Sequence, residues 1–593
     1  MRLLDYFNTA ASAVNLIITA GIIFSAAKAR KRPKAGSENS VRRQDACTDF
    51  CSGRLYWFLA ALMLAGGTAL RFVNLSALPD GLQQDEASIG YEAYCLANYG
   101  IDRNGYHWPV YPITWGSGGG SPLMIYCNVL TTKLFGSCVT SIRMVPAFFG
   151  SLTLVLFFCL LLRLYGRKTA LAGLAILSLT PWHLMLSRWS LDSNTAPFFE
   201  LTAVSVFLLA AEKKKTSLYA AAAALSALCL YSYGSANIVI PLWLLFSCVY
   251  CIRRKRLTPS QLLISGAVFL LVLVPLIIFY AVNFLGLPEI STAYISFPKF
   301  TSSHFGSVFL PLNRDFPAAV LRNIKGLFLT LTFGHKDEVI WNMMPGYAPL
   351  YSFTWPVTIL GIAVCAASLI RSIRRKVYQK DAVLVLLLCS AAVFSLLIEQ
   401  DINRQVFLFL PLVYCEVKGL RWLFRHAGKL TLIPALLFLT GALSFGRDYY
   451  GGRYNQLCAK DFMPGYGEAM VLADRLATGS GAHVYSTYTD VASPFMLTLY
   501  YTKYDPHAFL RTVKYKDPYA EFRVAYAFGH FTFGLPDKDL LSDEYKNDVF
   551  VLTKGEALQL LDEAEDHAIA LAGTESGNFV VLQRQNNTSP ATP

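Results

Sequence analysis

Long apolar segments recur along the whole chain of 593 residues and indicate its fold class. A helix of about 20 apolar residues crosses a hydrocarbon core of about 30 Å. The composition agrees, because 54% of the residues are hydrophobic and only 15% are charged, whereas soluble domains have about 25% charged residues. The pattern predicts a mainly α, polytopic membrane protein of about twelve transmembrane helices, near residues 9–27, 55–74, 144–164, 169–186, 195–212, 217–233, 238–252, 261–284, 352–370, 382–398, 405–420 and 430–446.

Basic residues are concentrated in the connectors on every second side of these segments, for example "IRRKR" and "RSIRRKVYQK". The short connectors on the other side, 187–194, 234–237 and 399–404, contain only Arg188 and Arg404 as basic residues. Basic connectors remain in the cytoplasm. The alternation therefore predicts that the carboxylates after the second segment, the long loops and the chain beyond Phe445 face outward. The net charge of +13 then reflects topology, and no nucleic-acid partner is needed to explain it.

The same patterns divide the chain into five predicted parts. A small extracytoplasmic α/β domain is expected at 449–583, where helical and extended patterns alternate. Most of the 13 cysteines lie in apolar runs and are expected to be buried as small hydrophobic residues. The other parts are an N-terminal transmembrane helix at 1–28, a basic cytoplasmic linker at 29–54, a transmembrane core at 55–446 with outward loops 75–143 and 285–351, and a disordered tail at 584–593.

Two adjacent carboxylates, Asp85 and Glu86, follow the second apolar segment in "LPDGLQQDEASIGYEAY". Two interpretations remain open. Acids at a helix N-terminus cap amide groups and interact favourably with the helix dipole. An ionised acid at the outer face of a membrane can also act as a general base, which takes a proton from an acceptor hydroxyl during group transfer.

Cationic residues on the predicted outer side are candidates for binding a lipid phosphate, because arginine presents forked donors that match phosphate oxygens. Arg188 and Arg404 each stand at the outer end of a span, and Arg71, Lys133 and Arg143 could join them. The alternative is that these arginines reach toward the membrane interface. A carboxylate base beside a cationic clamp is what transfer from a lipid phosphate requires.

The outward loops also contain candidates for contact with a sugar or an acceptor. Tyr91 and Trp115 are aromatic, and anchoring at the membrane interface explains such residues equally well. The segment "GHKDEVIW" supplies His335 and Asp337, with a solvated turn as the alternative. No Lys-Ser/Thr follows "GSGGG", which excludes a P-loop; its glycines suit a turn or a close approach of the backbone to a substrate.

Several segments resemble the membrane glycosyltransferases of the C-type fold, in the branch of the protein O-mannosyltransferases and the lipid A aminoarabinose transferases. The resemblance covers most of residues 55–446 and, more loosely, the tail. The matching segments are "LRFVNLSALPDGLQQDEASIGYEAYCLANYGIDRNGYHWPVY", "FGSCVTSIRMVPAFFGSLTL", "LTPWHLMLSRWSLDSN", "NMMPGYAPLY" and "NRQVFLFLP".

This resemblance implies inverting transfer of a sugar from a polyprenyl-phosphate donor to a hydroxyl outside the cytoplasm, with no tightly bound cofactor and with metal dependence left open. Asp85 matches the catalytic aspartate of the family, and Glu86 matches the neighbour that shapes the acceptor site. Arg188 matches an arginine of the corresponding outward loop. One departure is that "WGSGGGSPLMIYCN" has no lysine where relatives often show a Lys-Pro-Pro-like turn, so Lys133 or the arginines would have to bind the phosphate.

The expected protein is therefore an integral plasma-membrane glycosyltransferase whose partners are the bilayer, a lipid-linked sugar and an extracytoplasmic acceptor. One alternative is a transporter or flippase of lipid-linked sugars, although transporters place ionisable groups near the membrane midplane. The other is a non-catalytic protein of cell-envelope assembly, against which the intact Asp-Glu pair argues.

Overall fold

The computed structural model describes residues 2–30, 53–116, 118–301, 309–334, 339–520, 522–567 and 569–585. Most of the predicted linker 29–54 and of the predicted tail 584–593 falls outside these ranges. His335 and Asp337, the two acceptor-site candidates of the second long loop, also lie outside the described residues.

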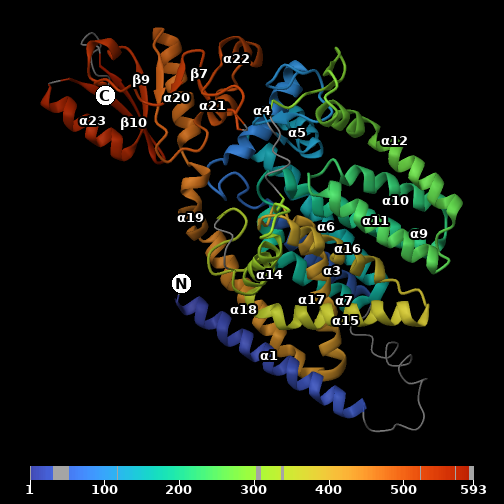
Figure 1. Ribbon diagram of the computed structural model, residues 1–593. Helices are drawn as coiled ribbons and strands as arrows, with labels where there is room; N and C mark the ends of the chain where they lie inside the picture. Colours follow the sequence, from blue (N-terminus) through green and yellow to red (C-terminus); the bar gives the residue numbers. More distant parts are fainter. Residues whose placement is uncertain are drawn as a thin grey trace.

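Long apolar helices form a bundle, with a smaller domain at one end (Figure 1). Each of the predicted spans falls on helix. In the described residues, eight segments are long and apolar enough to cross a membrane, one of which joins α17 and α18. The helices are α1 (Arg2–Arg30), α3 (Gly53–Phe72), α6 (Val139–Tyr165), α7 (Arg167–Leu179), α9 (Ala196–Lys213), α10 (Thr216–Cys229), α11 (Ala236–Arg253), α12 (Pro259–Phe284), α15 (Trp355–Arg375), α16 (Ala382–Leu397), α17 (Val406–Ala427) and α18 (Leu432–Tyr450).

The mainly α, polytopic fold predicted from the apolar pattern is confirmed. The count of eight is below twelve partly because α7, α10 and α16 have only 13, 14 and 16 residues. These lengths are shorter than the roughly 17 residues that a full crossing needs.

We call the end of the bundle that carries the smaller domain the domain pole, and the opposite end the basic pole. At the basic pole Glu212 of α9 pairs with Arg163 of α6 and, over 3.4 Å, with Lys380. Lys418 of α17 pairs with Asp381 over 2.9 Å. These ion pairs connect α6, α9 and α17 with the connector that precedes α16, where the sequence places its basic connectors.

Helices α15 and α17 pack with their backbones in contact. A methyl group added at Gly361 would lie 1.7 Å from the carbonyl oxygen of Cys415, and one added at Gly419 would lie 2.0 Å from that of Val357. Small residues permit such close approach of helices in membranes.

Short elements cover the domain pole. Helix α4 (Gln84–Tyr99) begins with a capping box between Gln83 and Glu86 and ends at Gly100 in the left-handed conformation (φ 71°). The other elements between the long helices are β1 (Ile113–Thr114), β2 (Gly118–Gly119), α5 (Pro122–Phe135), α8 (Pro181–Leu186), η1 (Asp192–Thr195), β3 (Ile290–Ser291), β4 (Ser296–Phe297), α14 (Phe316–Phe333), η2 (Ser352–Thr354) and η3 (Gly428–Thr431), of which η3 joins α17 to α18 at the basic pole.

The smaller domain is α/β, as predicted, and its sheet has the strand order β10-β11-β9-β5-β8-β7-β6. Strand β5 runs parallel to β8 and β9, and the other pairs are antiparallel. The strands are β5 (Val484–Ser486), β6 (Lys514–Tyr515), β7 (Ala525–Phe528), β8 (Phe531–Phe533), β9 (Val549–Thr553), β10 (Leu571–Ser576) and β11 (Phe579–Arg584). The helices are α19 (Arg453–Phe462), α20 (Tyr466–Ser480), α21 (Pro494–Thr502), α22 (Pro506–Thr512), η4 (Asp543–Tyr545) and α23 (Lys554–Asp566).

Helix α4 belongs to two hydrophobic cores. One face, with Ile89 and Leu96, packs against Met124 of α5. Another face, with Tyr91 and Cys95, shares a core with residues of the C-terminal domain. The hydroxyl of Tyr91 also donates a hydrogen bond of 2.8 Å to the carbonyl oxygen of Tyr504. The helix that carries the Asp-Glu pair is thus held between the bundle and the C-terminal domain.

Candidate active site

Asp85 lies half-buried in the first turn of α4 and faces the hairpin formed by β1 and β2. The indole N–H of Trp115, at the tip of this hairpin, donates a hydrogen bond of 3.2 Å to Oδ1 of Asp85. The sequence-predicted Asp85 and Trp115 are therefore neighbours in the structure.

A second carboxylate, Asp192, is held at the other end of the same hairpin. The backbone N–H of Ser121 donates a hydrogen bond of 2.8 Å to Oδ1 of Asp192. Asp85 and Asp192 are close enough to interact electrostatically. Gly119 and Gly120 allow this arrangement, because a methyl group would lie 2.0 Å from the ring of Tyr111 at Gly119 and 2.6 Å from Ile125 at Gly120. The glycine-rich segment is thus a tight hairpin that holds both acids.

The phenol of Tyr233, in the turn between α10 and α11, interacts electrostatically with Asp85, Asp192 and further charged residues. Its pKa is raised mainly by burial and also by the negative charges of Asp401, Asp192 and Asp85, while Arg404 lowers it. Tyr233 therefore lies within electrostatic reach of all these residues. Three carboxylates and one guanidinium, supplied by three separate segments, thus lie within electrostatic range of a neutral phenol at the domain pole.

Arg404, one of the predicted phosphate ligands, is the guanidinium within electrostatic range of Tyr233. Its side chain is 27% exposed, and its ion pairs are long, 3.6 Å to Glu399 and 3.7 Å to Asp401. A guanidinium held this loosely can turn toward an anionic ligand.

Burial raises the pKa of Asp85 above the usual range of an aspartate. Hydrogen bonds from Trp115 and Gln83 and the positive charge of Arg103 act in the opposite direction, and the charge of Glu86 adds to the rise. A carboxylate with a higher pKa is a stronger base. The environment thus makes Asp85 a better proton acceptor than an exposed aspartate.

Arg103 supports the indole ring that contacts Asp85. Its guanidinium carbon lies 5.4 Å from the centre of the Trp115 ring. Its Nε pairs with Glu92 over 3.1 Å, and Nη1 contacts the sulfur of Met496 in the C-terminal domain over 3.0 Å. Phe495 of the same domain meets the indole edge-to-face at 6.1 Å. The C-terminal domain therefore helps to position Trp115.

Glu86 occupies a different environment from its neighbour Asp85. It is fully buried and accepts two hydrogen bonds from Arg143, 2.9 Å from Nε and 2.7 Å from Nη2. The backbone N–H of Ser190 donates a third, over 2.8 Å. Arg143 also donates to the carbonyl oxygens of Pro79 and Gly81. The catalytic role predicted for Glu86 and the phosphate-binding role predicted for Arg143 do not fit this closed, buried pair, which holds α4 in place.

Arg188 and Arg71 are also buried, and both donate hydrogen bonds to groups of the protein. Arg188 donates to the carbonyl oxygens of Leu70, Val73 and Leu78, so it fixes the connector that leads to α4. Arg71 donates over 2.7 Å to the carbonyl oxygen of Gly67 and over 2.6 Å to Nδ1 of His183. The terminal nitrogens of both arginines bind the protein itself, so the phosphate-binding role predicted for them would require the loss of these hydrogen bonds.

Two further predicted residues do not join the site. Lys133 is exposed in the last turn of α5, about 18 Å along the helix from Ser121 at about 1.5 Å per residue, and its Nζ lies 5.9 Å from the centre of the Trp108 ring. Tyr91 is fully buried against the C-terminal domain and cannot contact a sugar.

Asp192 and Tyr233 were not among the predicted site residues. Asp192 stands only four positions after Arg188 in "SRWSLDSN", so an acid at the end of a span was a usable signal. Tyr233 has no such signal, because only the packing of α10 and α11 brings its turn to the carboxylates.

Comparison with known proteins gives a family match for part of the chain and a solved structure of similar fold. Residues 120–279 match the family model described as dolichyl-phosphate-mannose-protein mannosyltransferase. A comparison with curated proteins gives no match. Among solved structures, ArnT from Cupriavidus metallidurans bound to undecaprenyl phosphate is similar, with a TM-score of 0.53 and 13% identity over 90% of this chain and 99% of that chain.

The archaeal oligosaccharyltransferase AglB from Archaeoglobus fulgidus, in complex with an inhibitory peptide and a dolichol-phosphate, matches more weakly. Its TM-score is 0.41, with 12% identity over 75% of this chain and 64% of that chain. The family match and the likeness to ArnT confirm the resemblance expected from the sequence. The chain is an integral membrane protein of the C-type glycosyltransferase fold, similar to the protein O-mannosyltransferases and to ArnT.

Proposed function

We propose that this protein is a glycosyltransferase that moves a sugar from a polyprenyl-phosphate carrier to a hydroxyl acceptor at the domain pole, with Asp85 as the general base. The observation that carries the proposal is the Asp85 carboxylate at the domain pole of a chain of this fold, hydrogen-bonded to Trp115 and within electrostatic range of Asp192. The family match supports sugar transfer, and the undecaprenyl phosphate bound to ArnT supports a lipid-phosphate donor.

In the proposed reaction Asp85 takes the proton of the acceptor hydroxyl as its oxygen attacks the anomeric carbon of the donor. The bond between that carbon and the phosphate oxygen breaks, and the electron pair leaves with the polyprenyl phosphate. Attack from the side opposite to the phosphate inverts the configuration of the anomeric carbon. Burial favours this step because it makes the Asp85 carboxylate more basic.

Arg404 binds the phosphate of the donor in this proposal and stabilises the negative charge that develops on it. Its ion pairs of 3.6 and 3.7 Å with Glu399 and Asp401 are weak enough to be exchanged for phosphate oxygens. One oxygen of Asp192 accepts from Ser121, and in this proposal the carboxyl also contacts sugar or acceptor hydroxyls.

The domain pole faces outward in this proposal, since the opposite pole carries the basic connectors that remain in the cytoplasm. The C-terminal domain then stands outside the plasma membrane beside the site. Acceptor and donor would meet under the Trp115 hairpin, which the C-terminal domain supports through Phe495 and Met496.

The test is turnover of the purified protein with a panel of polyprenyl-phosphate sugars and candidate acceptors, measured as release of the carrier phosphate. Asp85→Asn should abolish release while the donor still binds. Asp80→Asn is the matched control, because Asp80 is an exposed aspartate of the same connector. Normal turnover by the Asp85→Asn protein would remove the base assignment.

A further inference from the structure

A buried acidic side chain, Glu200, lies within the helix bundle and outside the candidate active site. It belongs to α9, one of the helices that are long and apolar enough to cross a membrane. Glu200 is 0% exposed. Neither of its carboxyl oxygens has a hydrogen-bond partner in the described part of the chain. A buried polar group without a partner is costly, so this carboxyl requires an explanation.

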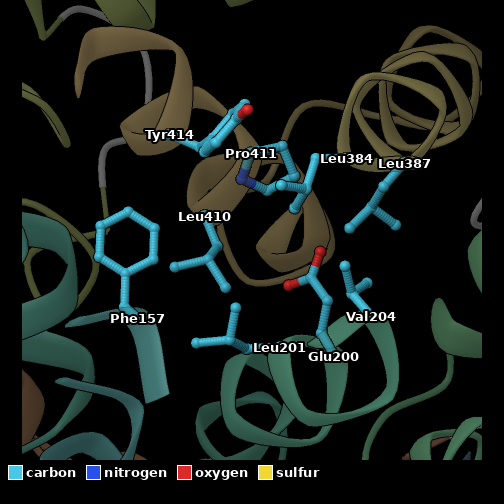
Figure 2. Close-up of a pocket in the computed structure, with 9 residues that line it drawn as sticks. All are labelled: Phe157, Glu200, Leu201, Val204, Leu384, Leu387, Leu410, Pro411 and Tyr414. Atoms are coloured by element: carbon cyan, nitrogen blue, oxygen red, sulfur yellow. The ribbon is translucent and has the colours of Figure 1, made fainter. Parts of the chain in front are cut away.

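The carboxyl points into a small cavity between α6, α9, α16 and α17 (Figure 2). Figure 2 shows its oxygens directed at the space beside Leu384, Leu410 and Pro411. The cavity has room for about one water molecule. Its lining is apolar apart from Glu200 itself and Tyr414, and comprises Phe157, Glu200, Leu201, Val204, Leu384, Leu387, Leu410, Pro411 and Tyr414.

These surroundings favour the neutral form of the carboxyl. The titratable groups near Glu200 are Tyr414 of α17 and Cys229 of α10, and in the described residues no cationic side chain pairs with it. An ionised carboxylate in an apolar interior without a counter-charge is strongly disfavoured. A carboxylic acid keeps one O–H donor and its acceptor oxygens, so it can bind water.

Pro411, which lines the cavity, leaves one carbonyl oxygen of α17 without its helical donor. Proline has no N–H, and therefore the carbonyl oxygen of Phe407, one turn earlier, receives no helical hydrogen bond from position 411. Ordered water is one of the ways in which membrane helices satisfy carbonyls freed by proline. A water molecule in the cavity would give the Glu200 carboxyl the hydrogen-bond partner that it lacks among the described residues.

Tyr414 connects the cavity with the basic pole. Its hydroxyl is hydrogen-bonded to the hydroxyl of Tyr165 at the end of α6. Tyr165 in turn donates over 3.2 Å to Oδ2 of Asp381. Lys418 donates to Tyr165 over 3.1 Å and to Asp381 over 2.9 Å. A continuous series of hydrogen-bonded groups thus leads from the hydroxyl of Tyr414, whose side chain lines the cavity, to the ion pairs of the basic pole.

We propose that Glu200 is a proton-binding site, a neutral carboxylic acid that holds one water molecule in this cavity and exchanges its proton with the basic pole through Tyr414 and Tyr165. In each exchange every hydroxyl accepts one proton and releases another, so both tyrosines stay neutral and no net charge moves. This site is separate from the proposed sugar transfer and is tested without it.

The test is infrared difference spectroscopy of the purified protein in H₂O and D₂O. The wild-type protein should show the C=O stretching band of a protonated carboxylic acid, which shifts to lower frequency in D₂O. Glu200→Gln should lose this band. Glu416→Gln is the matched control, because Glu416 is another buried acid of the bundle, bonded to Thr354, and its removal should leave the Glu200 band in place. If Glu200→Gln instead removes the bands of an ionised carboxylate, Glu200 is ionised in the wild-type protein and the proposal is overturned.

Tyr414→Phe tests the route of exchange. The Glu200 band should persist in this variant, and its shift after transfer into D₂O should be slower than in the wild-type protein. Tyr250→Phe removes another tyrosine hydroxyl near the basic pole, which is bonded to Ser372, and should leave the rate unchanged. Equal rates for the wild-type and Tyr414→Phe proteins would exclude the route through Tyr414.

A second measurement needs no substitution at Glu200. Dicyclohexylcarbodiimide, an apolar reagent that modifies protonated carboxyls within membranes, should label the α9 peptide at Glu200 in the wild-type protein, as read by mass spectrometry. An α9 peptide that stays unlabelled while other buried acids react would argue that Glu200 is ionised.

Discussion

The indole N–H of Trp115 donates a hydrogen bond of 3.2 Å to the Asp85 carboxylate, and the same ring is packed between Arg103 and Phe495. The partner of the proposed base is thus held by the first long loop and by the C-terminal domain together. A base positioned in this way is hydrogen-bonded to the indole and lies within electrostatic range of Asp192 and Tyr233.

Trp115→Phe should shift the pH dependence of sugar transfer. The hydrogen bond from Trp115 lowers the pKa of Asp85, so its loss raises that pKa further. Since the base must be deprotonated, the acidic limb of the kcat/KM profile should move to higher pH. Trp108→Phe is the control, because Trp108 stacks on Tyr126 and not on the base. An acidic limb that stays in place would separate Trp115 from the titration of Asp85.

Arg404→Ala should weaken use of the lipid donor, because it removes both a ligand of the donor phosphate and a charge that stabilises the departing phosphate. Loss of a hydrogen bond to a charged group costs about 1.5–3 kcal/mol, which corresponds to about a 10- to 100-fold rise in the KM of the donor. Lys133→Ala, which removes an exposed cation of the same pole, should leave this KM unchanged. If Lys133→Ala has the larger effect, the phosphate lies elsewhere.

Arg143→Met should strongly destabilise the protein, because it leaves the fully buried Glu86 without its partner. Breaking a buried ion pair in this way costs about 3–5 kcal/mol. The double variant Glu86→Gln/Arg143→Met should lose less thermal stability than the sum of the single variants, as measured by the midpoint of thermal unfolding. Arg447→Met removes an exposed arginine whose partner Asp448 keeps its ion pair with Arg453, and should cost about 0–1 kcal/mol. Additive single effects would contradict a coupled pair.

Gly361→Ala should destabilise the bundle, because the new methyl group would meet the carbonyl oxygen of Cys415 at 1.7 Å. Overpacking of this kind costs about 1–3 kcal/mol. Gly266→Ala in α12 is the control, since no atom lies within 4 Å of the added carbon, and alanine is the better helix former. Equal unfolding midpoints for the two variants would show that α15 and α17 can separate without cost.

The apolar pattern predicted the helices of the bundle because long hydrophobic segments in a membrane have few alternatives to helix. It could not separate the roles of Asp85 and Glu86. Successive residues on a helix point about 100° apart, so one acid faces the hairpin and the other meets Arg143. That difference depends on an arginine 57 positions away in the sequence.

The cationic residues show the same limit. From the sequence, Arg188 stands at the end of a span and is equally suited to a phosphate or to the membrane interface. In the structure Arg188 donates hydrogen bonds to the carbonyl oxygens of Leu70, Val73 and Leu78, which belong to an irregular connector. No pattern of side chains in the sequence shows that these carbonyl oxygens need donors. Tyr233 is the converse case, a tyrosine of an unremarkable turn that tertiary packing places among the charges.

Helix α4 shares its hydrophobic core with residues that follow it by several hundred positions, from Met463 to Val581. During synthesis this helix is therefore made early, but its packing is completed late. Tyr91 and Cys95 remain uncovered until the C-terminal domain has left the ribosome and folded. Nascent or truncated chains should then carry an unfinished site even when every apolar helix is already inserted, so that only the full-length product could acquire activity.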